Sequence, residues 1–466
     1  MDNTGYTPEE PIAAIATALA PSALGIIRMS GKNSIELLSK VFSRPKALTE
    51  AKGNTIVYGW IKDGDKKIDE VLVSVFRAPK SFTGEDMAEI NCHGGVAVVK
   101  AIFNLLLKNG FRQAQRGEYT FRAYINGKAD LTKAEAVREI IESRTDLSRG
   151  RAAGRLAGSL YEEIAAIKKL VVDTLASIEV EIEYPEDEET IADAFNRDGI
   201  VKAVERLKSL RDSWKSEKLY QDGVRLVLCG KTNAGKSSLF NSILKEDRAI
   251  VSDIEGTTRD WIESWISIDG IPARLFDTAG LRKTDDVVEQ SGVERTHDLS
   301  EDADVILYLQ DAGNKIDSAD LSFLKGFSKP VLFVWNKIDV LEKNSVYPEL
   351  TDEEKKMIPS LRNQIYLSAK KSDGIDTLIK EIKILIEKTG ASGREQAGLG
   401  SERQKNAVEQ ALECVEHALI AADDNYTLDA VVQDLEDSLD FLGEVTGEVT
   451  PDDVLESIFS NFCVGK

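Results

Sequence analysis

One eight-residue segment of the chain has the residue types and spacing of a phosphate-binding loop. Residues 230–237 read Gly-Lys-Thr-Asn-Ala-Gly-Lys-Ser and stand between an apolar run and an expected helix. Glycines let the backbone curl so that its N–H groups point at phosphate oxygens, and the helix N-terminus adds favourable dipole charge. We expect Lys236 to neutralise the β- and γ-phosphates and Ser237 to bind Mg²⁺. The alternative, a simple glycine-rich turn, is disfavoured by the order of strand, loop and helix.

A second motif follows at the distance that such a loop requires. Asp277, Thr278, Ala279 and Gly280 come at the end of an apolar run. Asp277 can reach Mg²⁺ through a water molecule, and the Gly280 N–H can sense the γ-phosphate. Turns after strands are common, and this motif alone would be weak evidence. It supports a nucleotide site because it follows residues 230–237 at this distance.

The third and fourth motifs point to guanine as the base. A carboxylate at Asp339, in the run Asn336-Lys337-Ile338-Asp339, can accept hydrogen bonds from N1–H and the 2-amino group of guanine. Adenine offers neither donor there and would leave a buried carboxylate unpaired. The segment Ser368-Ala369-Lys370 is expected to close over the base. Together the four motifs resemble those of translation-factor-type GTPases.

The segment between the first two motifs should contain the switch that senses the γ-phosphate. The run Gly256-Thr257-Thr258-Arg259-Asp260 fits, and Thr258 is the candidate for the second Mg²⁺ side-chain ligand. We therefore expect Lys236 and Thr258 to take part in catalysis.

Two residues depart from Ras-like chemistry. Leu281 stands where Ras-type proteins carry a water-orienting glutamine, so another group must orient the water. Asp285, Asp286 and Glu289 are the acidic side chains that follow. The side-chain carbonyl of Asn233 can bind a monovalent cation beside the phosphates, which could supply the charge that an arginine finger gives elsewhere.

The elements that position these motifs fall into three regimes. Short apolar runs punctuated by Gly and Pro predict an α+β domain over 1–125. Three- and four-residue apolar spacing predicts a discontinuous helical domain over 126–220 and 380–466. Alternating strand and helix patterns predict an inserted α/β GTPase domain over 221–379, with a doubly wound, mostly parallel sheet. The predicted fold class is therefore multidomain, α+β and α/β, with a helical domain between.

Composition narrows the function classes. The 59 Lys and Arg residues against 80 Asp and Glu residues give a net charge of −21, which argues against a simple basic nucleic-acid binder. Residues 1–128 are nevertheless net basic, whereas 400–466 are strongly acidic, as is usual for a solvated helical face. Four dispersed cysteines form no CxxC pair and fit a reducing compartment. The uncharged stretch 11–27 contains two prolines and is short for a membrane span, so we expect a cytoplasmic protein without a membrane segment.

Motifs throughout the chain resemble the MnmE (TrmE) family of tRNA-modification GTPases. Besides the GTPase motifs, the resemblance rests on segments outside that domain. These are Phe-Thr-Gly-Glu-Asp at 82–86, His-Gly-Gly at 93–95, Gly-Glu-Tyr-Thr-Phe-Arg-Ala at 117–123, Lys-Ala-Glu-Ala at 133–136 and the terminal Cys-Val-Gly-Lys at 463–466. The family usually ends in Cys-Ile-Gly-Lys, so valine at 464 is a conservative departure.

This resemblance implies an N-terminal domain that forms a homodimer and binds 5-formyl-tetrahydrofolate or a related folate. It implies GTP hydrolysis that K⁺ and Mg²⁺ support. It further implies a flavoprotein partner of the MnmG type, in a heterotetramer, and tRNA as substrate. With that partner the enzyme would modify C5 of the wobble uridine (U34) of certain tRNAs.

The resemblance also assigns residues to these sites. Potassium would be held by Asn233, Ser252, Ile254 and Thr257, and Glu289 would position the attacking water. The folate pocket would contain Arg28, Glu85, Lys128 and Lys466, since Arg and Lys can pair with folate carboxylates and Glu85 can accept from the pterin. Cys463 is a candidate for the modification chemistry. The residues expected to bind nucleotide come from each of the motifs above. They are Asn233, Ala234, Gly235, Lys236, Ser237, Ser238, Ser252, Asp253, Ile254, Glu255, Gly256, Thr257, Thr258, the segment 277–280, Asn336, Lys337, Asp339 and the segment 368–370.

Two other functions stay open at this point. The chain could be a regulatory switch, such as a ribosome-assembly GTPase, although it contains no recognisable RNA-binding module. Alternatively, residues 1–125 could serve dimerisation alone. Folate binding by that region separates both alternatives from a tRNA-modifying enzyme.

Overall fold

The computed structural model describes residues 10–183, 195–245, 250, 262–277, 301–342, 346–388, 398–424 and 428–466. The chain divides into two compact units. Unit 1 comprises 1–138, 155–208 and 401–466, and unit 2 comprises 139–154 and 209–400. Each unit is built from segments that are far apart in the sequence.

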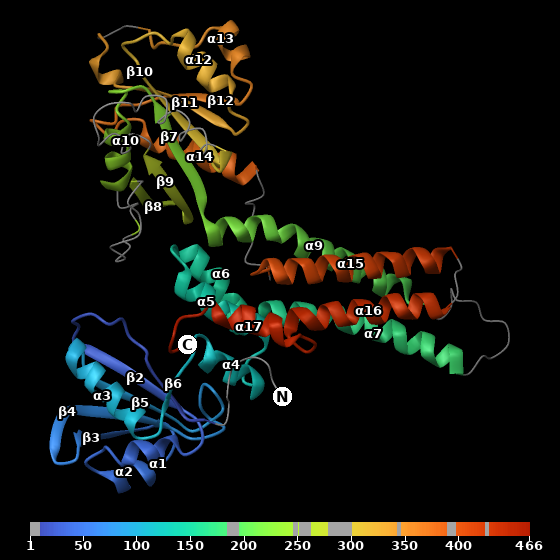
Figure 1. Ribbon diagram of the computed structural model, residues 1–466. Helices are drawn as coiled ribbons and strands as arrows, with labels where there is room; N and C mark the ends of the chain where they lie inside the picture. Colours follow the sequence, from blue (N-terminus) through green and yellow to red (C-terminus); the bar gives the residue numbers. More distant parts are fainter. Residues whose placement is uncertain are drawn as a thin grey trace. The chain divides into compact units, whose positions relative to one another are not determined.

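A six-stranded sheet with the strand order β3-β4-β5-β2-β1-β6 forms the N-terminal part of unit 1 (Figure 1). All neighbouring strands are antiparallel except β1 and β6. Helices α1, α2 and α3 contribute to the hydrophobic core on one face of this sheet. The bounds are β1 Ile12–Ile15, β2 Leu24–Ser30, α1 Ser34–Ser39, α2 Pro45–Thr49, β3 Thr55–Asp63, β4 Lys66–Phe76, β5 Met87–His93, α3 Val96–Lys108 and β6 Arg112–Gln113.

On the other face of this sheet, Tyr119 packs against Ile12, Ala14 and Met87, whereas β3 and β4 expose apolar side chains. Tyr58 and Leu72 are directly opposite each other on β3 and β4, and Ile56 lies two residues from Tyr58 on the same face. The exposed fractions of Ile56, Tyr58 and Leu72 are 67%, 50% and 46%. We call this surface the open face of the N-terminal sheet.

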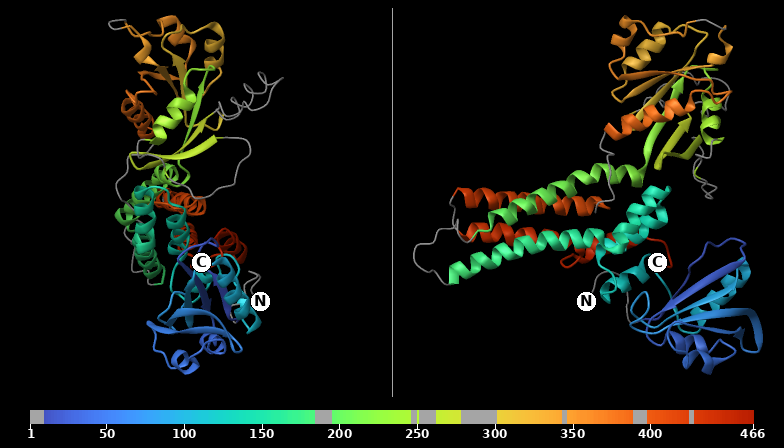
Figure 2. Two further views of the ribbon diagram at one scale, coloured as in Figure 1. Left: turned by 90° about the vertical axis from the view of Figure 1, so that its left-hand side faces the viewer. Right: turned by 180° about the vertical axis from the view of Figure 1, so that it is seen from behind.

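Long helices make up the rest of unit 1, and parts of three of them, within 139–154 and 209–222, belong to unit 2. Helices α7, α15 and α16 lie side by side (Figure 2), and the last helix, α17, packs on α4 through an edge-to-face contact between Phe459 and Phe121. The bounds are α4 Glu118–Ile125, α5 Leu131–Glu142, α6 Asp146–Ala157, α7 Ser159–Glu183, α9 Arg197–Asp222, α15 Glu402–Asp423, α16 Leu428–Thr446 and α17 Asp452–Ser460. Among the described residues, no helix combines the length and the apolar character needed to cross a membrane.

Unit 2 is organised around a second six-stranded sheet, with the order β12-β11-β10-β7-β9-β8. Its strands are parallel except for the antiparallel pair β8–β9. The bounds are β7 Val224–Gly230, α10 Lys236–Ile243, β8 Ile262–Ile268, β9 Ile271–Asp277, β10 Val305–Asp311, α12 Ser318–Lys325, β11 Val331–Asn336, a 3₁₀ turn Ile338–Val340, α13 Asp352–Met357, β12 Leu361–Tyr366 and α14 Ile375–Lys388.

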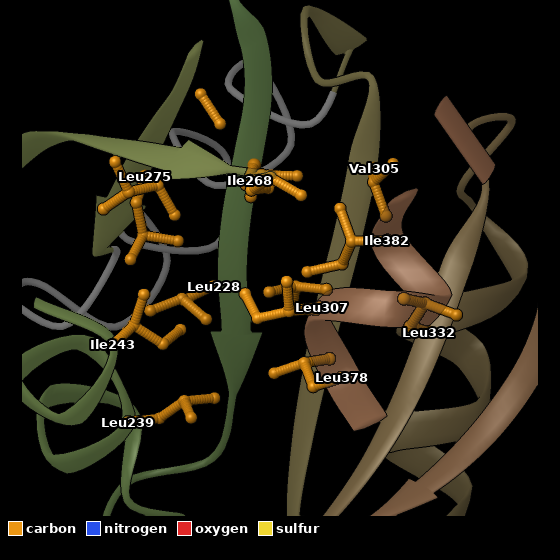
Figure 3. Packing of buried hydrophobic residues seen from close by; sticks show 14 of the residues in the cluster. Leu228, Leu239, Ile243, Ile268, Leu275, Val305, Leu307, Leu332, Leu378 and Ile382 are labelled. Atoms are coloured by element: carbon orange, nitrogen blue, oxygen red, sulfur yellow. The ribbon is translucent and has the colours of Figure 1, made fainter. Parts of the chain in front are cut away.

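Alternate residues of the central strands enter two separate cores. On β10, Val305, Leu307 and Leu309 belong to the core that includes α10 and α14, which Figure 3 shows from close by. Ile306 and Tyr308 belong to the core that includes α12. This alternation is the period of two that a strand covered on both faces requires.

The predicted fold class is confirmed, including the mostly parallel sheet with helices on both faces. Two local features differ from expectation. The antiparallel edge strand β8 was not predicted, and the first part of the predicted helical domain is divided into the separate helices α5, α6 and α7 before α9. The second interruption is at Gly158, whose φ of 112° a continuous helix does not allow.

Candidate functional site: a nucleotide site and an N-terminal pocket

The phosphate-binding loop lies between strand β7 and helix α10, where its sequence places it. Gly235 precedes the helix with φ 98°, and a Cβ built on it would lie 2.2 Å from Asn336 Nδ2, so only glycine fits this position. Lys236 is the first residue of α10 and is 8% exposed. Its Nζ donates to the carbonyls of Gly230 and Lys231 at 2.6 and 2.8 Å, at the base of the loop.

Two of the predicted Mg²⁺-site residues meet beside this loop. Ser237 Oγ donates to Asp277 Oδ2 at 3.1 Å. Asp277 ends strand β9, which pairs with β7 in parallel, so the carboxyl ends of both strands are at the same edge of the sheet. The pair offers one hydroxyl and one carboxylate oxygen, which are the donor types that Mg²⁺ prefers.

Asn336 joins the base-binding side to the phosphate side. Its Nδ2 donates to the Ala234 carbonyl at 2.8 Å, and its Oδ1 accepts from the Ala369 N–H at 3.0 Å. The side chain is 1% exposed, so both of its polar atoms need such partners. Asn336 therefore ties 368–370 to the phosphate loop.

The predicted guanine-binding carboxylate, Asp339, is held in its ionised form. Ser368 Oγ donates to Asp339 Oδ1 at 2.6 Å, and this hydrogen bond lowers the pKa of Asp339 from its ordinary value. Lys337, two residues before Asp339, has φ 64° and pairs with Asp311 at 2.8 Å.

Four other residues predicted to bind nucleotide have exposed side chains. They are Asn233, whose φ is 64°, Ser237, Ser238 and Lys370.

Several predicted residues lie outside the described residues. They include the switch segment with Ser252, Ile254, Thr257 and Thr258, and Glu289. The remaining ones are Asp253, Glu255, Gly256, Thr278, Ala279 and Gly280.

In unit 1 the C-terminal tail lies against the N-terminal sheet. Arg28 NH1 donates to the Gly465 carbonyl at 3.1 Å, although the two residues are 437 positions apart. The Tyr119 N–H donates to the Lys466 carbonyl at 3.3 Å, and Val464 forms a bridge with Arg116. Burial and the charge of Arg28 lower the pKa of Lys466. Two of the four predicted folate residues, Arg28 and Lys466, are thus neighbours.

Glu85, the third predicted residue, is held by a buried ion-pair network. It accepts from Ser30 Oγ at 2.7 Å and from Arg122 NH1 at 3.1 Å. Arg122 is fully buried and also donates to Glu118, which is itself fully buried, at 2.9 Å. A carboxylate held by a buried guanidinium has little freedom to turn.

The remaining two candidates differ in their surroundings. Lys128 is exposed, and its Cγ lies 3.3 Å from a Cβ built on Gly84, next to Glu85. Cys463 is exposed in the tail, and its carbonyl accepts from the Lys466 N–H at 3.3 Å. The structure places both in the same unit as Arg28 and Glu85.

Arg122, Glu118 and Tyr119 build this region, although none of them was predicted as a site residue. Tyr119 OH donates to the Arg28 carbonyl at 2.8 Å, and the Arg28 guanidinium lies 5.6 Å from the Tyr119 ring centroid. The sequence feature that could have identified them is the four-residue spacing of Glu118 and Arg122 in a short helix whose other residues are uncharged. Such spacing puts both charges on one helix face.

Comparisons with known proteins agree across the whole chain. The family model for the "MnmE helical domain" matches residues 131–463, and the one for the "GTP-binding protein TrmE N-terminus" matches residues 11–128. The tRNA modification GTPase MnmE of Treponema denticola is 52% identical over 472 residues, which cover 99% of each chain. The protein of the same name from Borreliella burgdorferi is 42% identical, with 98% of each chain covered.

A solved structure of Era from Aquifex aeolicus bound to GDP·AlF₄⁻ is 30% identical over 41% of this chain and 66% of its own, with a TM-score of 0.29. The full-length relatives and the two family models carry the assignment. This chain belongs to the MnmE family of tRNA modification GTPases and is a GTP hydrolase.

Proposed function

We propose that this GTPase is stimulated by potassium and, with a flavoprotein partner of the MnmG type, modifies C5 of the wobble uridine (U34) of certain tRNAs. A tetrahydrofolate-type donor would supply the one-carbon unit. GTP and tRNA are the substrates, and the working assembly is a homodimer joined by the partner into a heterotetramer, acting in the cytoplasm. The observation that carries the folate part is the contact of the C-terminal tail with Arg28 and Tyr119.

For nucleotide binding we assign Mg²⁺ to Ser237 and Thr258, with Asp277 acting through water. Mg²⁺ would neutralise negative charge on the β- and γ-phosphates. Support comes from the 3.1 Å approach of Ser237 Oγ to Asp277. Lys236 would exchange its two carbonyl partners for phosphate oxygens, and Asp339 would accept from guanine.

For hydrolysis we assign potassium to Asn233, Ser252, Ile254 and Thr257, and water positioning to Glu289. A bound K⁺ would add positive charge beside the phosphates, where Ras-type enzymes use arginine. Asn233 is exposed in the loop, with its backbone in the left-handed region, so its side-chain oxygen is accessible to an ion.

For the folate we assign Arg28, Glu85, Lys128 and Lys466. Arg28, which is paired with Glu89 at 2.8 Å, and Lys466 give this corner two cations against one carboxylate, and such a site suits the carboxylates of a folate. Glu85, oriented by Arg122, would accept hydrogen bonds from the pterin. The folate would supply the one-carbon unit, and Cys463 is our candidate for a chemical role next to it.

The open face of the N-terminal sheet supports the homodimer. Arg28 is opposite Glu89 on β5, and Glu89 lies on the same face as Asn91, which is opposite Leu72. The apolar side chains of the open face and Arg28 therefore share one surface. A second copy covering this surface would bury Ile56, Tyr58 and Leu72 and enclose the folate pocket.

Calorimetric titration of the full-length protein with 5-formyl-tetrahydrofolate tests this assignment. We expect wild-type binding, a loss of affinity of about tenfold or more for Arg28→Met because a charged hydrogen bond is removed, and wild-type affinity for the control Lys108→Met at the exposed end of α3. Absence of folate binding by the wild type, or unchanged binding by Arg28→Met, would contradict the assignment and favour a switch or a purely dimerising domain.

A further inference from the structure

The second residue of the phosphate loop, Lys231, is bound to the start of helix α12. Its Nζ forms ion pairs with Asp317 and, at 2.9 Å, with Asp320. Asp317 is the N-cap of α12 and Asp320 is the third helical residue. Each side chain accepts from the backbone N–H of the other, which is a capping box. One lysine thus contacts both carboxylates that fix the first turn of this helix.

Asp320 connects this contact to the core. It is 4% exposed, and its Oδ1 accepts from Tyr308 OH at 2.6 Å. Tyr308 is on β10 and is 2% exposed, and burial followed by its hydrogen bond to Asp320 raises its pKa. Lys231 is therefore anchored to a side chain that the core itself holds in place.

The main chain of Lys231 faces the nucleotide site. Its carbonyl accepts from Lys236 Nζ at 2.8 Å and from the Ala234 N–H at 3.3 Å. The side chain points to α12 while the backbone forms part of the loop that receives phosphate. Holding the side chain therefore restrains the loop backbone.

We propose that Asp317 and Asp320 are positioning residues for GTP binding that act through Lys231. They hold the phosphate loop in its binding shape before nucleotide arrives, so that less conformational entropy is lost on binding. The same loop N–H groups contact phosphate in the bound substrate and in the transition state. Removing the restraint therefore weakens binding and leaves the chemical step nearly unchanged.

The test uses the full-length protein and two substitutions. Lys231→Met removes the cation and keeps the apolar stem. Asp317→Asn removes one charge and keeps the helix start, since asparagine is an equally good N-cap. Titration with a fluorescent GDP analogue gives Kd, and steady-state GTP hydrolysis gives KM and kcat. We expect Lys231→Met to raise Kd and KM by about tenfold with kcat within about twofold, and Asp317→Asn to raise them by about threefold. Lys231→Arg should restore values near wild type.

The matched control is Lys355, whose ion pair with Glu349 at 2.7 Å lies in the same unit and is similarly exposed. Lys355→Met should leave Kd, KM and kcat unchanged. Wild-type GDP affinity in Lys231→Met, a fall in kcat as large as the rise in KM, or an equal effect in Lys355→Met would overturn the proposal. If Lys231→Met does not fold, Lys231→Gln is measured against the same thresholds.

Discussion

The nucleotide site and the N-terminal pocket are assembled in different ways. The described parts of the nucleotide site follow successive parallel strands, so that residues 230–237, 277, 336–339 and 368–370 meet at one edge of the sheet. The pocket joins Arg28 to a tail 437 positions away and depends on the fully buried pair Arg122–Glu118. Loops that follow neighbouring strands of one sheet can be specified by short local motifs. A pocket that includes the C-terminal tail is specified by contacts between residues that are far apart in the sequence.

The largest expected effect concerns the buried network of the N-terminal pocket. Arg122→Met removes the cation that Glu118 and Glu85 share. Glu118 keeps its ion pair with Arg112 at 2.6 Å, whereas Glu85 keeps the hydrogen bond from Ser30, so we expect a loss of about 3 kcal/mol in the stability of this region. Hydrogen exchange followed by mass spectrometry should show lost protection in β1, α4 and the tail, with unchanged protection in β7 and α10. Equal loss in both regions would show that the two sites are not independent.

A similarly large effect is expected on hydrolysis. Glu289→Ala should lower kcat by about 100-fold, because it removes the side chain that we propose orients the attacking water. The Kd for GTP, measured by titration with a non-hydrolysable analogue, should stay nearly unchanged. A large loss of affinity would assign Glu289 to binding instead.

Asp339, which we propose binds the guanine base, should account for a smaller loss of nucleotide affinity. Asp339→Asn should weaken GTP binding by about 30- to 100-fold, since charged hydrogen bonds to the base are lost, and should improve binding of xanthosine nucleotides. Because the Ser368 hydrogen bond lowers the pKa of Asp339, its contribution is present above the ordinary carboxyl range and is lost only at more acidic pH. The ratio of wild-type to Asp339→Asn affinity should therefore be constant from about pH 8 to pH 5. Unchanged discrimination against xanthine would contradict the assignment.

The difference between the two regions also explains what the sequence could predict. The motifs that contain Lys236, Asp277 and Asp339 predicted both the fold around them and a nucleotide site, because each lies at the end of a strand of one sheet. Arg28 and Lys466 were assigned only through a family resemblance, because no local pattern connects β2 with the chain terminus. Arg122 received no role, since whether a charged residue is buried depends on tertiary packing that spacing alone does not show.

The smallest expected effect concerns the thiols. Burial followed by the charge of Asp69 raises the pKa of Cys92 to about 11, and Cys229 is also buried. Cys463 is exposed in the tail. At about pH 8, iodoacetamide should therefore alkylate Cys463 before Cys92 and Cys229, because only accessible thiolate reacts. Peptide mass mapping gives the order, and prior labelling of Cys92 would contradict the described packing of the N-terminal sheet.

We propose that a bound alkali ion takes part in hydrolysis, together with Glu289, in place of the missing glutamine, and this is the central claim to test. GTP hydrolysis by the full-length protein should be measured in KCl and NaCl at equal ionic strength, with Asn233→Ala beside the wild type. We predict that the wild type is faster in KCl and that Asn233→Ala loses this difference. Equal wild-type rates in the two salts would contradict the account.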